Sequence, residues 1–223
     1  MLIFPLPRDV HWSVHKVQNW STIVHKSISG GRLAVPLYPN NPLWSWEFTY
    51  EVLLDDSTRL SYTGSPYLNT LYTDLQIIEA FYFAQKGAGG LFFYQPPDST
   101  VTSQLLSDPD SNNNSEIVHT IGGYPTSSGM QVVTESVQAM DTSSLVVTTG
   151  AGGVYSLQNP GTTAPYEGYV LHWTALPTPP IHASFNYYYQ CAFSEDNQDY
   201  EQFTYNLYTL KSIKFEQVRV TTG

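Results

Sequence analysis

Two stretches with strict alternation of apolar and polar residues mark the clearest strands of this chain. The first has an apolar side chain at every second position: Trp44, Trp46, Phe48, Tyr50 and Val52. The second repeats the pattern 141 residues later: Phe185, Tyr187, Tyr189, Cys191 and Phe193. A period of two is that of a strand with one buried and one polar face. We therefore predict that both stretches line a core.

Shorter apolar runs predict further strands. Residues 20–26 and 32–38 are separated by Gly30-Gly31, and Pro39-Asn40-Asn41-Pro42 is a turn signal. We expect residues 32–38 to form an antiparallel hairpin with residues 43–53. The run LFFY at residues 91–94 predicts a buried strand that ends before Pro96-Pro97.

Helical spacing in residues 70–86 predicts a helix. Asn69 or Thr70 can cap its start and Gly87 can end it. Its apolar side chains recur every three or four residues: Leu71, Leu75, Ile78, Phe81 and Tyr82.

A second helix is expected after the aromatic strand near the C-terminus. Ser194 or Asp196 would cap it, and Lys211 would lie near its end, where the helix dipole favours a cation. Its expected buried stripe comprises Tyr200, Phe203, Leu207 and Leu210. A closing strand then alternates through Ile213 and Phe215.

The middle of the chain differs from both ends. From about Asp98 to Thr178, Ser, Thr, Gly, Asn and Pro dominate, and no helix is expected. Short strands are predicted at residues 131–134, 144–149 and 169–173. We predict an α+β, mainly β domain built from residues 1–97 and 179–223 and interrupted by an inserted all-β module, residues 98–178. The side chains expected in the core are Trp44, Trp46, Phe48, Phe81, Tyr189, Cys191, Phe193, Phe203, Leu207 and Phe215.

Charge narrows the classes of partner. The 223 residues carry a net charge of -10, and no Lys or Arg occurs between Gly87 and Leu210. Binding of nucleic acid or an anionic membrane depends on cations, so neither is expected as the main partner. Charged residues make up 13% of the chain, well below the roughly 25% of ordinary soluble domains. That composition suits a β-rich protein whose surface is covered by neighbours.

The start of the sequence, its longest apolar runs and its cysteine content bear on where the protein is made. The start, MLIFPLPRDVHW, has no basic flank and no small-residue cleavage site, so it does not resemble a signal peptide. No stretch approaches the roughly 20 apolar residues of a membrane span. The single Cys191 excludes an internal disulfide, as suits a protein made in a reducing cytosol.

Three polar groupings are candidate metal-binding or catalytic sites. His11 and His15 have the spacing of a helical metal site, but no helical pattern surrounds them, which favours ordinary loop or strand histidines. Alternating acids and amides in residues 108–116 resemble the start of a calcium loop, but the Gly and Glu that an EF-hand needs are missing, so an Asx-rich turn is favoured and an irregular calcium site stays open. The last grouping is acidic and fits a helix N-terminus better than a catalytic carboxylate pair: Glu195, Asp196, Asp199 and Glu201.

Two further candidates concern Cys191 and the middle module. Cys191 stands within an aromatic strand, which favours a buried thiol over a nucleophile. Aromatic side chains in the module could stack on sugar rings, although Trp173 is the only indole there. The pattern KGAGG at residues 86–90 follows a helix, so we interpret it as a connector. No catalytic, cofactor or metal residues are predicted.

Several segments, in this order, resemble one family. They are WSVHK, LWSWEFTYEVL, LQIIEAFYFAQKG, LFFYQPPDSTVTSQ, YYYQCAF and DYEQFTYNLYTLKSIKFEQVR. Together they are similar to the distal tail proteins of long-tailed bacteriophages, a family shared with gene transfer agents. The family's features fall on the aromatic strand 187–193, the acidic turn 195–201, the helix 203–210 and Lys214-Phe215. The resemblance covers the two flanks, a little over half of the chain.

The resemblance implies a structural, non-enzymatic role. Such proteins are β-rich belts, similar to a β-sandwich or split barrel with one or two packed helices, and assemble as rings, commonly hexamers. The ring joins the tail tube protein to the central baseplate hub protein at the virion tail tip, after assembly in the host cytoplasm. In some relatives, inserted modules contact other tail-tip proteins or host surface glycans. The alternatives are a tail-associated glycan-binding protein that acts through residues 98–178, and a hydrolase, for which no acid/base constellation is apparent.

Overall fold

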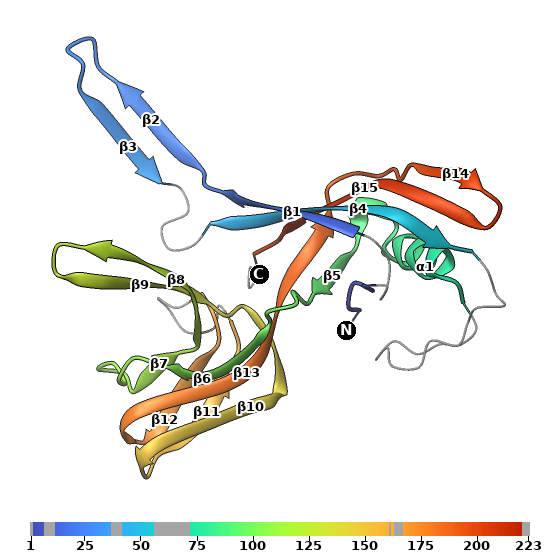
Figure 1. Cartoon of the computed structure of the whole chain (residues 1–223). Coiled ribbons are helices and arrows are strands. Elements are labelled where there is room, and N and C mark those ends of the chain that lie inside the picture. Colours follow the sequence, from blue (N-terminus) through green and yellow to red (C-terminus); the bar gives the residue numbers. More distant parts are fainter. Residues whose placement is uncertain are drawn as a thin grey trace. The chain divides into compact units, whose positions relative to one another are not determined.

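The computed structural model describes residues 2–6, 12–36, 42–55, 72–160, 162 and 167–219 (Figure 1). Across these residues the chain forms antiparallel β-sheets and a single α-helix, which confirms the expected fold class, α+β and mainly β. The chain divides into two compact units. Unit 1 comprises Met1–Phe93 and Cys191–Val218, and unit 2 comprises Tyr94–Gln190 and Arg219–Gly223.

Unit 1 is built on an antiparallel sheet centred on two long strands. Strand β4 (Leu43–Leu54) lies between β1 (Trp12–Asn19) and β15 (Leu207–Gln217). On the side away from β4, β15 pairs with β14 (Tyr200–Thr204) and with the last three residues of β13 (Thr178–Phe193). Strands β1 and β14 therefore lie on opposite sides of the β4–β15 pair.

Aromatic side chains form the core of unit 1. The ring centroids of Phe92 and Phe193 lie 4.6 Å apart, and the Phe215 ring lies 5.1 Å from Phe4 and 5.3 Å from Phe48. All five residues are at most 4% exposed. The alternation in β4 and β13 thus does what its period predicts, since one face of each strand is buried.

Helix α1 (Asp74–Gln85) packs on this aromatic core. It begins one turn later than expected: Thr73 is the N-cap, and its side chain and that of Gln76 form a reciprocal capping box. The expected caps Asn69 and Thr70 lie outside the described residues. The helix ends at Lys86, whose φ of 55° is left-handed, and leads through a 3-10 turn (η2, Gly87–Gly89) to the expected strand β5 (Leu91–Tyr94).

The predicted second helix is wrong, because residues 200–217 form a β-hairpin. Strand β14 turns at Tyr205-Asn206 into β15, and Asn206 adopts the left-handed φ of 59° that Asn tolerates in turns. Leu210 does lie in the core, but it does so in a strand, opposite Tyr50 of β4. The helical spacing of its apolar residues was outweighed by pairing with β4 and by the abundance of Thr and Tyr, which favour strands.

The expected pairing of residues 32–38 with β4 is also wrong. Strand β3 (Arg32–Pro36) pairs with β2 (Thr22–Lys26) in a hairpin of its own, closed by a turn in which Gly30 has a φ of 83°. The partner of β4 is β1, in a register that places Asn19 opposite Leu43. The β2–β3 hairpin is thus an excursion between two paired strands. Gly30-Gly31 therefore marks the turn of the β2–β3 hairpin itself and not a connection that leads to pairing with β4.

Unit 2 contains strands and no helix among its described residues. Strand β13 lies between β6 (Thr100–Leu105) and β10 (Ala139–Ala151). A second sheet has the order β11 (Val154–Gln158), β12 (Val170–Ala175) and β7 (Asn114–Glu116). Strands β8 (Val118–Thr126) and β9 (Gly129–Ser136) form a separate hairpin. The strands predicted at residues 131–134, 144–149 and 169–173 coincide with parts of β9, β10 and β12.

The boundary between the units lies within β13 rather than before it. Because β13 begins at Thr178 and pairs with β6 and β10 up to Tyr188, its first thirteen residues belong to unit 2. Only Cys191–Phe193 pair with β15. The predicted division placed all of residues 179–193 in the belt. That residues 98–178 form a removable insertion stays a prediction.

Candidate interaction surfaces

The β2–β3 hairpin, which we call the arm (Thr22–Pro36), is exposed along its whole length. Strands β2 and β3 have no buried position, in contrast to the half-buried alternation of β4. Its exposed apolar side chains are Ile23 (45%), Val24 (41%), Ile28 (110%), Leu33 (62%) and Val35 (45%). Isolated two-stranded hairpins are marginal in water, and apolar surface gathered in this way marks a site of interaction.

The arm is also cationic. Lys26 lies directly opposite Arg32 in the hairpin register, and like charges placed in this way repel each other. From Val10 to Trp46 the sequence holds three of the nine basic residues and none of the nineteen acidic ones. The arm therefore opposes in sign the strongly acidic remainder of its own chain.

Strand β1 forms an edge of the unit 1 sheet, because within the described residues its one strand partner is β4. Residues 13–20 are all exposed, including Val14 and Val17 at 38% each. Lys16 extends back over the sheet, with its Nζ 4.1 Å from the ring centroid of Trp44. An exposed edge of eight residues is a ready template for pairing with another chain.

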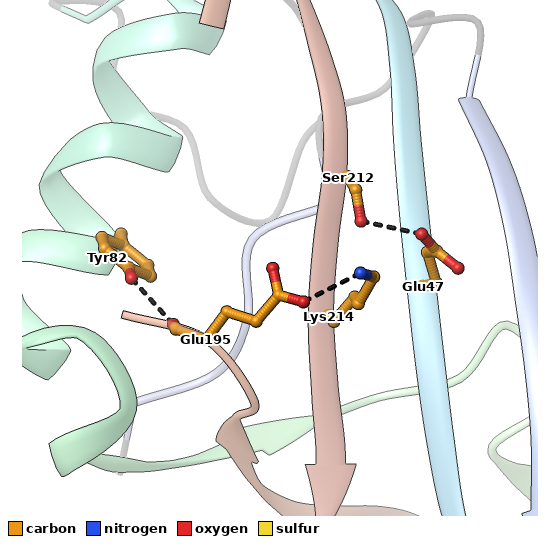
Figure 2. Close-up of polar contacts among 5 residues, drawn as sticks. All are labelled: Glu47, Tyr82, Glu195, Ser212 and Lys214. Atoms are coloured by element: carbon orange, nitrogen blue, oxygen red, sulfur yellow. Dashed lines mark hydrogen bonds and ion pairs between the residues drawn. The ribbon is translucent and has the colours of Figure 1, made fainter. Parts of the chain in front are cut away.

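Polar contacts link strand β15 to strand β4 and to the turn that precedes β14 (Figure 2). Lys214 Nζ lies 2.8 Å from Glu195 Oε1, and Ser212 Oγ donates to Glu47 Oε1 on β4 at 2.8 Å. Tyr82 of α1 donates its hydroxyl to the backbone oxygen of Glu195 at 2.9 Å. These contacts fix the acidic turn that precedes β14 against the helix and the sheet.

The other three carboxylates of the predicted acidic cluster are also engaged. Asp196 Oδ1 accepts a hydrogen bond from the backbone N–H of Ala88 at 2.8 Å. Asp199 and Glu201 both bind Lys211 Nζ, at 3.3 and 3.2 Å, and these contacts raise the pKa of the lysine. Because no helix follows, the expected role of the cluster as a helix N-terminus is wrong. Its carboxylates instead serve as turn and ion-pair groups, with two carboxylates for the one Lys211.

The tip of the β14–β15 hairpin presents aromatic side chains to solvent. Phe203 is 51% exposed and Tyr205 is 85% exposed. The prediction that Phe203 lies in the core is therefore wrong, and the reason is that Phe203 belongs to an outer strand and not to a buried helical stripe. Leu207, another expected core residue, is only half-buried.

Most of the other expected core residues are buried. Those that are at most 8% exposed are Trp44, Trp46, Phe48, Tyr189, Cys191, Phe193 and Phe215. Phe81 is half-buried and contacts Phe92 edge-to-face at 5.4 Å. Cys191 is fully buried and, as the single cysteine of the sequence, has no partner for a disulfide within the chain.

Unit 2 contains a buried polar cluster that the sequence did not reveal. His119 of β8 and Glu135 of β9 face each other in the hairpin register, and His119 Nε2 lies 3.3 Å from Glu135 Oε2. Tyr189 donates its hydroxyl to the same oxygen at 3.2 Å, while the Tyr187 ring stacks on His119 with centroids 4.2 Å apart. His119 is 6% exposed and Glu135 is 2% exposed. The cluster holds the base of the β8–β9 hairpin against β13.

Burial dominates the electrostatics of this cluster. It raises the pKa of Tyr187 above its ordinary value, and the charges of Asp98 and Glu135 raise it further. Burial and the neighbouring Glu135 likewise raise the pKa of Tyr189. Both hydroxyls are therefore held protonated, and that of Tyr189 donates to Glu135. Groups this well enclosed fix a position and are out of reach of a substrate.

Beyond its base, the β8–β9 hairpin is exposed and carries no charge. Residues 120–134 contain no acidic or basic side chain. The exposed apolar residues of the hairpin are Ile121, Tyr124, Met130, Val132 and Val133. This hairpin is a second candidate surface, of a different chemical character from the arm.

The loop at residues 108–116 has the geometry of an Asx turn, as expected. Asp110 Oδ1 accepts hydrogen bonds from the backbone N–H groups of Asn112 and Asn114, both at 2.8 Å. Asn113 is left-handed, with a φ of 62°. The Asp110 carboxylate is thus turned towards its own backbone.

Trp173 is not available for stacking on a sugar. It is 1% exposed, and its indole N–H donates to Ser115 Oγ at 3.0 Å. Among the described residues of unit 2, the exposed aromatic rings are those of Tyr124 and Tyr155.

The remaining polar candidates form no metal site in the part of the chain that the structure describes. No group of three or more His, Cys, Asp or Glu side chains is placed to hold a metal ion there. His15 lies exposed on β1, and His11 falls outside the described residues. In that same part of the chain, no helix is long and apolar enough to span a bilayer.

One of the features above left a signal that could have been found from the sequence, and two did not. The absence of acidic residues from Val10 to Trp46 sets the arm region apart before any fold is known. The strand β1 was hidden because its side chains, WSVHKVQN, are not clearly alternating. The pairing of His119 with Glu135 depends on the register of β8 and β9, which has a shift between Thr120 and Gly122 that no sequence pattern marks.

Comparison with protein families and curated proteins found no relative. No family model matches the chain, and no curated protein matches it.

Proposed function

We propose that this chain is a structural ring subunit of a bacteriophage tail tip, a distal tail protein that connects the tail tube to the central baseplate hub. The choice of this family comes from the segments of the two flanks that resemble it and that follow one another in the same order. It assigns no catalytic role, cofactor or metal to the chain. Its partners are further copies of the chain, commonly six in such a ring, together with the tube and hub proteins at the virion tail tip.

The observation that carries the proposal is the continuous exposed segment from Ser13 to Pro36. Every residue in it is exposed except the half-buried Ser21. Three more large apolar side chains, Val14, Val17 and Trp20, join those of the arm. A stretch that is ordered as strands and yet covers nothing in its own subunit suits a protein that is completed by neighbours.

The topology of unit 1 favours a ring over a two-fold dimer. Strands β1 and β14 lie on opposite sides of the β4–β15 pair and differ in sequence and charge. A contact that joins one kind of edge to the other is heterologous, and heterologous contacts close into rings when the rotation per subunit allows it.

Electron microscopy of the purified chain tests this proposal. We expect discrete closed rings in negative stain and a matching mass by light scattering. Antibody labelling should place the chain at the tail tip of purified virions. A chain found elsewhere in the virion, or in none, would refute the tail-tip assignment regardless of its oligomeric state.

The alternative of a glycan-binding role keeps a specific basis in the exposed Tyr124 and Tyr155 of unit 2. Tyrosine rings can stack on the faces of pyranose sugars. Binding of bacterial surface polysaccharide that is lost in a Tyr124→Ala variant and retained in an arm-deleted chain would favour this role.

A further inference from the structure

The arm carries two facing cations, and among the described residues no carboxylate of its own subunit forms an ion pair with them. Lys26 and Arg32 are directly opposed across the hairpin, and both are exposed. Facing like charges destabilise a strand pair unless carboxylates lie beside them. The nearest acidic residues in the sequence are Asp9 and Glu47, and neither lies in the arm.

The opposite side of the unit 1 sheet has the complementary surplus. Asp199 and Glu201 share Lys211, which leaves one carboxylate charge in excess beside β14. All three side chains are more than half exposed. Within the described residues β14 pairs with β15 alone, so its other edge is open.

The two surfaces also match in their apolar content. The arm offers Ile23 and Val35, which are cross-strand neighbours on one face of the hairpin. The β14–β15 hairpin offers Phe203 and Tyr205, exposed by 51% and 85%. Aromatic rings flanked by charge are typical of the residues that dominate protein interfaces.

We propose that the arm of one subunit docks along the β14 edge of a second copy of this chain, with Lys26 and Arg32 against Asp199 and Glu201. The occupant is a second copy because the arm is cationic while the rest of the chain is strongly acidic. The arm cannot dock on the β14 strand of its own chain. It continues from β1, and β1 and β14 lie on opposite sides of the sheet. This inference rests on the proposed ring, for which it supplies the donor and the acceptor surface.

Charge reversal with matched controls tests the contact. Lys26→Glu and Lys86→Glu each change the net charge from -10 to -12, and Lys86 is an exposed residue outside the arm. We expect Lys26→Glu to weaken association by roughly tenfold or more, and Lys86→Glu to have little effect. Glu201→Lys should weaken association in the same way, with the exposed Glu216→Lys as its control. Sedimentation velocity and mass photometry give the readout.

Mixing the variants makes the test specific. In a mixture of the Lys26→Glu and Glu201→Lys chains, a reversed arm can meet a reversed β14 edge and a native arm can meet a native edge. The mixture should therefore assemble although each variant alone does not. Equal assembly of Lys26→Glu and Lys86→Glu, or a mixture that stays dissociated, would overturn the docking proposal.

The outcomes separate this inference from the proposed function. A ring that is insensitive to Lys26→Glu overturns the docking contact and leaves the ring subunit intact. A dimer or open filament that is sensitive to Lys26→Glu keeps the contact and contradicts a closed ring. A wild-type chain that stays monomeric at millimolar concentration overturns the docking contact, and the labelling of virions then decides the tail-tip assignment.

Discussion

Phe215 and Phe203 lie in the same β-hairpin and differ in burial. Phe215 is fully buried among the aromatic rings of unit 1, whereas Phe203 is 51% exposed. Large-to-small substitution of a buried ring removes both transfer free energy and packing contacts, which surface substitution does not.

We expect Phe215→Ala to lower the free energy of unfolding by about 3–5 kcal/mol and Phe203→Ala to lower it by less than about 1 kcal/mol. Urea titration followed by tryptophan fluorescence gives both values. Similar losses for the two variants would mean that Phe203 is buried, in the chain or in an assembly, and repeating the titration at several protein concentrations distinguishes the two cases.

At the residue scale the sequence was most informative where one face of a strand is buried. The period of two in β4 and β13 identified Trp46, Phe48, Cys191 and Phe193 as core residues without any knowledge of the fold. It failed at Phe203, whose apolar character was read in a helical register. The buried Glu135 was missed because its burial depends on a partner, His119, that only the hairpin register supplies.

At the scale of elements, the arm is a removable excursion. Because Asn19 lies directly opposite Leu43, strands β1 and β4 can be joined by a short turn in place of residues 20–41, which leaves the buried Pro42 in the chain. Such a chain keeps every buried side chain of the two strands. Of the described residues that it loses, 20–36, all are exposed except the half-buried Ser21.

We expect the free energy of unfolding of a chain in which a four-residue Gly/Asn turn replaces residues 20–41 to lie within about 1 kcal/mol of that of the intact chain. It should also remain monomeric where the intact chain assembles. Chemical denaturation at low protein concentration measures the first effect, and light scattering measures the second. A large loss of stability in the isolated subunit would show that the arm packs on its own chain.

The sequence predicted where strands and the helix α1 form better than it predicted which strands pair with each other. Helix α1 was found because its capping and stop signals act within a few residues, although the true cap, Thr73, lies later than expected. Strand β3 was paired with the wrong neighbour, because strand pairing depends on where the chain goes next and not on local pattern. The β14–β15 hairpin was mistaken for a helix because apolar residues three or four apart also occur in a hairpin with a tight turn.

At the scale of the whole molecule, the two units have separate cores. Unit 1 buries the Phe215 cluster, and unit 2 buries a different set around Trp173 and Ile181. Cores that share no side chains can melt at different temperatures.

We expect two resolved transitions in differential scanning calorimetry. Phe215→Ala should lower the temperature of one of them, and Trp173→Ala, which also removes the hydrogen bond to Ser115, should lower the other. If each variant shifts the entire transition by the same amount, the two units unfold as one cooperative body. That result would also count against the predicted insertion of residues 98–178.

One feature of unit 2 determines how it can be handled in the laboratory. Its single Lys or Arg is Arg219, which lies near the C-terminal end of the sequence. Arg219 Nη1 binds Glu167 Oε1 at 3.1 Å. Trypsin, which cuts after lysine and arginine, therefore has no site between Lys86 and Lys211. Digestion leaves a single peptide of 125 residues, from Gly87 to Lys211, that carries nearly all of unit 2. Trypsin can thus release most of that unit, residues 94–190, in one piece and without any change to the gene.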